Sequence, residues 1–181
     1  MDDFAYIPAK YDWNYRPNTQ SGRRPDYVDV EHAKEWPARH TRYLTMGLCA
    51  FFRETGYEPA IELAGRLARF VRHHADFFDE EGGFLARHDG DMGPKSAVQF
   101  CSHVDTLLGF ADYALTSDER EFAEFARRGY EYARRLGNPE IGFFPEYIKW
   151  PQDRGVISCE LCDTAAMTGA ALKLTEAGVG D

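Results

Sequence analysis

Apolar residues recur with the period of an α-helix in five successive segments of the chain. The stripe of the first segment, which begins near Glu31, consists of Trp36, His40, Tyr43, Leu44, Gly47, Ala50 and Phe51. Gly56 is placed to end this helix in a left-handed conformation. Pro59 suits the first turn of a second helix, because proline has no N–H to leave unpaired there. The second stripe consists of Ala60, Ile61, Ala64, Leu67, Ala68, Val71 and Phe78.

Three further helices are predicted beyond a loop over residues 80–94, in which Phe84 and Leu85 form a short extended piece. The third helix has the stripe Ala97, Cys101, Val104, Leu107, Leu108, Ala111 and Leu115. Asp118 and Glu121 have the spacing of a capping box for the fourth helix, which Gly137 ends. A second long loop leads to a fifth helix at about 158–176. Because no segment alternates with a period of two, the pattern predicts an all-α fold.

The helices also repeat. Residues 64–66 followed by 83–84 resemble residues 126–128 followed by 142–143, about 60 residues later, and each unit is two helices plus one long loop. The repeat predicts antiparallel helical hairpins that form part of an (α/α) toroid over residues 31–181. Residues 1–30 lack periodicity and contain three prolines, which predicts an extended arm. The fifth helix has no partner after it, so we expect a second copy or a missing C-terminal half to cover it.

Composition narrows the possible partners. The net charge is −9 and the sequence pI is about 5.2, so the surface repels phosphate backbones and nucleic acid is not an expected partner. No apolar run approaches the roughly 18 residues of a membrane span. The start lacks the basic-then-apolar order of a signal peptide, which predicts a cytoplasmic protein. The four cysteines are too few for a disulfide framework in a chain of 181 residues.

The densest group of reactive side chains is the run 159–163, Cys-Glu-Leu-Cys-Asp, at the start of the fifth helix. Thiolates and carboxylates are stabilised at the N-terminus of a helix by its dipole. The spacing of Cys159 and Cys162 is also that of zinc ligands, although one pair supplies only two ligands. The alternative, which the spacing alone favours, is that Cys162 is a core residue and Cys159 a loop residue.

Glu146 precedes Glu160 by 14 residues and lies in the loop before the fifth helix. Paired carboxylates about 5–10 Å apart carry out glycoside hydrolysis, one as proton donor and the other as base or nucleophile. The candidate catalytic residues are therefore Glu146 and Glu160, although glutamate is also common on surfaces. Candidate substrate-binding residues are His103 and Asp105 at the start of the third helix, and Tyr147 and Trp150 beside Glu146, which could stack on a sugar ring.

Two runs resemble the six-hairpin glycosidase superfamily. The run CSHVDTLLGFADYALTSDEREFAEFARRGYEYA is similar to its hairpins, and ISCELCDTAAMTGAALKLTEAG is similar to the active-site stretch of the zinc–cysteine β-L-arabinofuranosidase family. The resemblance implies that Glu160 and Cys162 are zinc ligands and that Glu146 is the proton donor. The family's nucleophilic cysteine lies in a later Cys-Cys pair, for which this sequence has no counterpart. The resemblance therefore implies a partial chain.

Three functions fit these observations. The first is a glycoside hydrolase acting on a carbohydrate substrate, represented by its N-terminal half and possessing a zinc site. The second is another α/α-toroid sugar enzyme, an epimerase or a polysaccharide lyase, in which His103 would be essential. The third is a non-catalytic helical-repeat protein that binds a partner through the fifth helix. Fold analogy alone does not separate these functions.

Overall fold

The computed structural model describes residues 3–5, 35–75, 77–85, 98–148 and 158–180. Within these ranges the helices are α1 Glu35–Thr55, α2 Glu58–His73, α3 Phe100–Ser117, α4 Arg120–Arg134 and α5 Leu161–Glu176. Two short strands, β1 Val98–Gln99 and β2 Tyr147–Ile148, form an antiparallel pair. The all-α class predicted from the sequence is confirmed. Apart from residues 3–5, the predicted N-terminal arm lies outside the described residues.

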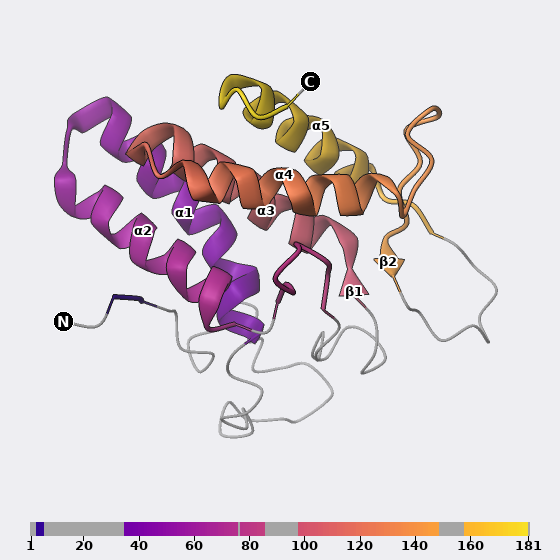
Figure 1. Cartoon of the computed structure of the whole chain (residues 1–181), viewed down its shortest axis with the longest axis horizontal. Helices are drawn as coiled ribbons and strands as arrows, with labels where there is room; N and C mark the ends of the chain where they lie inside the picture. Colours follow the sequence, from indigo (N-terminus) through magenta and orange to yellow (C-terminus); the bar gives the residue numbers. More distant parts are fainter. Residues whose placement is uncertain (1–2, 6–34, 76, 86–97, 149–157, 181) are drawn as a thin grey trace, which may run out of the picture.

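The helices form hairpins side by side (Figure 1). α1, α3 and α5 run in one direction, and α2 and α4 run in the opposite direction. α2 packs on α1 and α4 packs on α3, while α3 lies between α1 and α5. One row of parallel helices with returning helices beside it is the arrangement of part of an α/α toroid. It places the N-terminal ends of α1, α3 and α5 at the same end of the molecule.

The predicted repeat is visible at the ends of α2 and α4. After α2, Phe78 and Phe84 form an isolated antiparallel bridge, and after α4, Asn138 and Phe143 do the same. Each turn contains a glycine with a positive φ, Gly82 at 86° and Gly142 at 67°, which a side chain with a Cβ rarely adopts. The short extended piece expected at 84–85 is therefore present.

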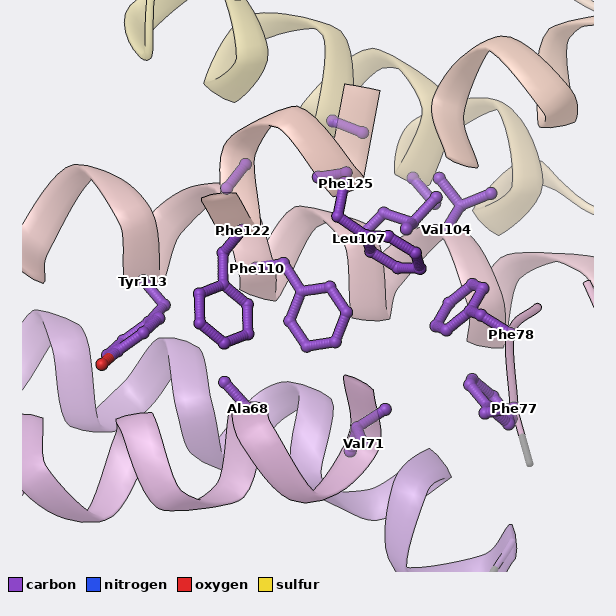
Figure 2. Packing of buried hydrophobic residues seen from close by; sticks show 14 of the residues in the cluster. Ala68, Val71, Phe77, Phe78, Val104, Leu107, Phe110, Tyr113, Phe122 and Phe125 are labelled. Carbon is purple, nitrogen blue, oxygen red and sulfur yellow. The ribbon is translucent and has the colours of Figure 1, made fainter. Parts of the chain in front are cut away.

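Aromatic side chains fill the space between the two hairpins (Figure 2). Phe110 of α3 has its ring centroid 5.5 Å from that of Phe122 and 5.9 Å from that of Phe125, both on α4. Ala68 and Val71 of α2 close this cluster from the other side. Fully burying an aromatic or aliphatic side chain contributes about 1.5–3 kcal/mol, so this cluster holds the hairpins together.

The apolar stripe predicted for the first helix does not face the core. Tyr43, Leu44 and Phe51 are exposed, whereas Thr45 and Cys49 are buried. The α1 face that packs on α2 and α3 is thus the one that carries Thr45, Leu48 and Cys49. An apolar stripe by itself does not say which side of a helix its neighbours occupy. On α5, Leu161 and Leu172 are likewise exposed, and what covers them remains a prediction.

One local prediction from the sequence is wrong. Asp118 is not the N-cap of α4, because it ends α3 in the left-handed region with a φ of 62°, and Glu119 precedes α4 instead. Two arginines of α2 join this helix to other segments. Arg66 donates to the carbonyl oxygen of Phe4, and Arg69 forms ion pairs with Asp3 and Glu119. No helix among the described residues has the length and apolarity that crossing a membrane requires.

Candidate functional site

The N-terminal ends of α3 and α5 are joined by the segment around β2. Gln99 pairs with Tyr147 in the β1–β2 ladder, and the Phe100 peptide N–H donates to the Glu146 carbonyl oxygen at 2.9 Å. The Glu146 peptide N–H in turn donates to the carbonyl oxygen of Ser158, also at 2.9 Å. These bonds hold the backbone of Glu146 against the starts of both helices. Glu146 therefore lies at the same end of the molecule as the start of α5.

The Glu146 carboxylate is oriented by a neighbouring hydroxyl. Ser158 Oγ donates to Glu146 Oε2 at 2.5 Å, and the two side chains are half-buried. The hydrogen bond occupies one carboxylate oxygen and fixes the direction of the other. A positioned carboxyl group of this kind can exchange a proton with a ligand oxygen.

Asp163 lies at the centre of the site and is fully buried. Its Oδ2 accepts a hydrogen bond of 2.9 Å from the Glu160 peptide N–H, whereas its Oδ1 has no hydrogen-bond partner among the described residues. Burial raises the pKa of Asp163 to about 6, and the negative charges of Glu160 and Glu146 add to this shift. The peptide N–H groups of Glu160 and Cys101 partly offset it.

Two thiols adjoin this carboxylate. One ligand atom each from Cys101, Cys162 and Asp163 lie within 4.8 Å of one another. Cys162 Sγ also donates to Glu160 Oε2 at 3.1 Å. Burial, the Glu160 carboxylate and the Cys101 thiol raise the pKa of Cys162, and burial raises the pKa of Cys101. We call Cys101, Glu146, Glu160, Cys162 and Asp163 the acid–thiol cluster.

Asp105 is one helical turn beyond Cys101 on α3. Tyr43 donates from its hydroxyl to Asp105 Oδ2 at 3.1 Å, and Arg42 Nε lies 3.5 Å from the same oxygen. Burial raises the pKa of Asp105, against the opposing effects of Arg42 and Tyr43. Asp105 therefore joins α1 to α3 beside the acid–thiol cluster.

The other predicted binding residues have different positions. His103 is only 3% exposed, and its ring stacks on those of Phe77 and Phe84 at centroid distances of 3.8 and 4.6 Å. Burial lowers the pKa of His103 to about 4. A ring enclosed in this way is a core residue, so we leave His103 out of the proposed site. Tyr147 is half-buried on β2, next to Glu146, and Trp150 lies outside the described residues.

The predicted zinc ligands Glu160 and Cys162 are in contact, so their donor atoms fit a shared cation. Cys159, which the Cys-x-x-Cys spacing pairs with Cys162, points instead to the Glu160 carbonyl oxygen at 3.8 Å. The sequence analysis included Asp163 in the run 159–163 without giving it a role, and it missed Cys101 and Ser158 as members of the site. Asp163 follows Glu160 by three residues, the distance from an N-cap to the third helical position, and that spacing could have revealed it.

The fold resembles that of a cellobiose 2-epimerase. The enzyme, from Bacillus thermoamylovorans, aligns with a TM-score of 0.58 and 17% sequence identity, over 77% of this chain and 39% of that chain. It is an α/α-toroid enzyme of the six-hairpin glycosidase superfamily. At this identity the likeness shows the fold alone, and the present chain spans well under half of the enzyme's length. The sequence matches no protein-family profile and no curated protein.

Proposed function

We propose that this chain forms the acidic end of the substrate cleft of a carbohydrate-active α/α-toroid enzyme of the glycoside hydrolase type. The observation that carries the proposal is the acid–thiol cluster, in which carboxyl groups from two separate segments meet at the N-terminal ends of α3 and α5. Carboxylates that accept hydrogen bonds from sugar hydroxyls, together with one that exchanges a proton, are what glycoside chemistry needs. An α/α toroid gathers such groups at the shared end of its parallel helices.

Within this proposal Glu146 is the proton donor to the leaving glycosidic oxygen. Its hydrogen bond with Ser158 leaves the second carboxylate oxygen to face a ligand. Glu160 is exposed at the start of α5 and contributes the second carboxylate. Asp105 on α3 and Tyr147 on β2 are the proposed substrate contacts. A zinc ion held by Glu160 and Cys162 belongs to the same proposal, and bound there it would favour the thiolate form of a coordinated cysteine.

The test is hydrolysis of a panel of aryl glycosides by the full chain, with Glu146→Gln as the decisive variant. Loss of a general acid lowers turnover by about 10²–10⁴-fold. Glu140→Gln is the matched control, because Glu140 is an exposed glutamate in the same connection between α4 and α5. Turnover by Glu146→Gln equal to that of the unchanged chain would remove Glu146 as proton donor. Calorimetric titration with the same sugars measures binding independently of turnover.

A sugar epimerase is the second candidate, favoured by the fold of the structural neighbour. Incubation with reducing disaccharides, followed by chromatographic separation of the C2 epimers, distinguishes the two reactions. Epimer formation that depends on His103 would support this candidate. The His103 ring is buried and stacked on Phe77, which is unfavourable for contact with a substrate. A chain that binds no sugar and forms a stable complex through α5 would instead fit a non-catalytic interaction protein.

A further inference from the structure

The acid–thiol cluster contains a buried hydrogen-bond acceptor that no group among the described residues satisfies. Asp163 is 0% exposed, yet its Oδ1 has no hydrogen-bond partner among the described residues. A buried polar atom without a partner costs about 1–3 kcal/mol, more when it is charged. Among the described residues, Asp163 also takes part in no salt bridge, and the charges of Glu146 and Glu160 near it are negative. A cation bound beside Asp163 would compensate the buried negative charge of its carboxylate.

The atoms around Asp163 are of the kind that a cation of intermediate softness prefers. Cys101 and Cys162 each bring a sulfur atom, and Asp163 brings an oxygen, all within 4.8 Å of one another. Tetrahedral zinc with bonds of about 2.0–2.3 Å places its ligand atoms roughly 3.3–3.8 Å apart. Small side-chain rotations are therefore enough to bring the three atoms to coordination distance. Cys162 is exposed while Cys101 and Asp163 are buried, so among the described residues Cys162 is the ligand that faces solvent.

We propose that Cys101, Cys162 and Asp163, brought together from α3 and α5, form a binding site for a thiophilic divalent cation such as Zn²⁺. Glu160, whose carboxylate touches the Cys162 thiol, provides a fourth ligand. This inference deepens the proposed function by assigning Cys101 and Asp163 to its site. It also excludes Cys159, the residue that the Cys-x-x-Cys spacing would have chosen.

Binding of the ion displaces the protons of its thiol ligands. Each thiol loses its S–H proton to solvent as its sulfur forms a bond to the cation, so two protons leave for each ion bound, while Asp163 coordinates as the carboxylate. The two thiolates and two carboxylates then carry four negative charges against the two positive charges of the ion. The ion thereby links the starts of α3 and α5. Repulsion among the negatively charged ligands is offset by the attraction of each ligand to the ion.

The test uses Co²⁺ titration of the full chain after treatment with a chelator and a reductant. Thiolate coordination to Co²⁺ gives a near-ultraviolet charge-transfer band that needs no enzyme activity. We expect about one equivalent of Co²⁺ to bind and Zn²⁺ to displace it, consistent with the order of affinities of these metals. Cys101→Ser and Cys162→Ser each abolish the band, and Asp163→Asn weakens the affinity by at least about tenfold.

Cys159→Ser is the matched control, because it removes a thiol three residues from Cys162 and outside the group of three ligands. We expect it to retain the band and the stoichiometry. Mass-spectrometric mapping of alkylated cysteines adds a second measurement, in which Zn²⁺ protects Cys101 and Cys162 but leaves Cys159 reactive. Circular dichroism of every variant checks that the helices form.

Several results would overturn the inference. These are a band that persists in Cys101→Ser, a band lost in Cys159→Ser, or a Cys101–Cys162 disulfide as the only product under metal loading. The proposed function fails separately, because Glu146→Gln is expected to bind Co²⁺ like the unchanged chain whatever its effect on sugar turnover.

Discussion

Two buried aspartates, Asp112 on α3 and Asp163 on α5, have opposite electrostatic surroundings. The Asp112 side chain is 3% exposed, and its Oδ1 lies 3.1 Å from Arg53 Nη1 and 3.3 Å from Lys173 Nζ. Asp163 is fully buried, and in the described part of the chain it has no ion pair. Its charged neighbours are the acids Glu146 and Glu160.

The contrast separates an end of the molecule held by ion pairs from an end where a buried carboxylate has none. Arg53 lies in the last turn of α1 and Lys173 in the last turn of α5, so Asp112 ties together the C-terminal ends of all three parallel helices. At the N-terminal ends of α3 and α5 the described residues instead bring acids and thiols together, and none of the cations among them forms an ion pair with Asp163. A buried charge without a partner lowers stability, so the acid–thiol cluster fits a ligand site better than a folding element.

The largest effect is expected from removing both cations around Asp112. The double variant Arg53→Met, Lys173→Met leaves a buried carboxylate unpaired, which costs about 3–5 kcal/mol in free energy of unfolding. Urea denaturation at neutral pH measures it. Arg134→Met serves as the control, because it breaks an exposed pair with Glu131 that is worth at most about 1 kcal/mol. A double variant no less stable than this control would show that Asp112 needs no partner.

A smaller effect on the free energy of unfolding is expected from replacing Asp163, and at neutral pH it should be stabilising. Its pKa rises from the ordinary 3.8 to about 6 on folding, so the folded state holds the proton more tightly than the unfolded chain. Stability from this group is therefore fully present below about pH 4 and is lost as the pH rises through 6. A shift of this size corresponds to at most about 3 kcal/mol.

Asp163→Asn keeps a carbonyl oxygen to accept from the Glu160 peptide N–H and removes the titration. Its free energy of unfolding relative to the unchanged chain should therefore increase from pH 4 to pH 7. Denaturation in the presence of a chelator measures the difference without interference from bound metal. A difference that stays constant over this pH range would contradict the uncompensated burial of Asp163.

The helices were predictable because periodicity, glycine ends and the proline at position 59 are local signals. The side of α1 that is buried was not predictable, since Thr45 and Cys49 face the core only because α2 and α3 pack there. Asp118 shows the same limit. Its spacing to Glu121 is that of a cap, yet the tight connection between α3 and α4 requires a left-handed residue at that position.

The site was predictable only in part. The run 159–163 and Glu146 could be found, because acids and cysteines near the start of a helix stand out in a sequence. Cys101 could not, since its place within an apolar stripe predicts a core residue, and it is indeed buried. Only the packing of α3 against α5 brings it to Cys162. Chemistry shared between distant segments depends on that packing, which no local pattern specifies.

The smallest effect concerns whether the two cations around Asp112 act independently. Lys173→Met alone leaves Arg53 paired with the carboxylate, so we expect a loss of only about 1 kcal/mol. Because either cation alone keeps Asp112 paired, the sum of the two single losses should fall short of the loss in the double variant. Lys173 also pairs with Glu176, and Glu176→Gln isolates that exposed contribution. If the losses in unfolding free energy of Arg53→Met and Lys173→Met add up to that of the double variant, each cation acts on Asp112 separately. The two ends of the molecule would then differ less than their geometry indicates.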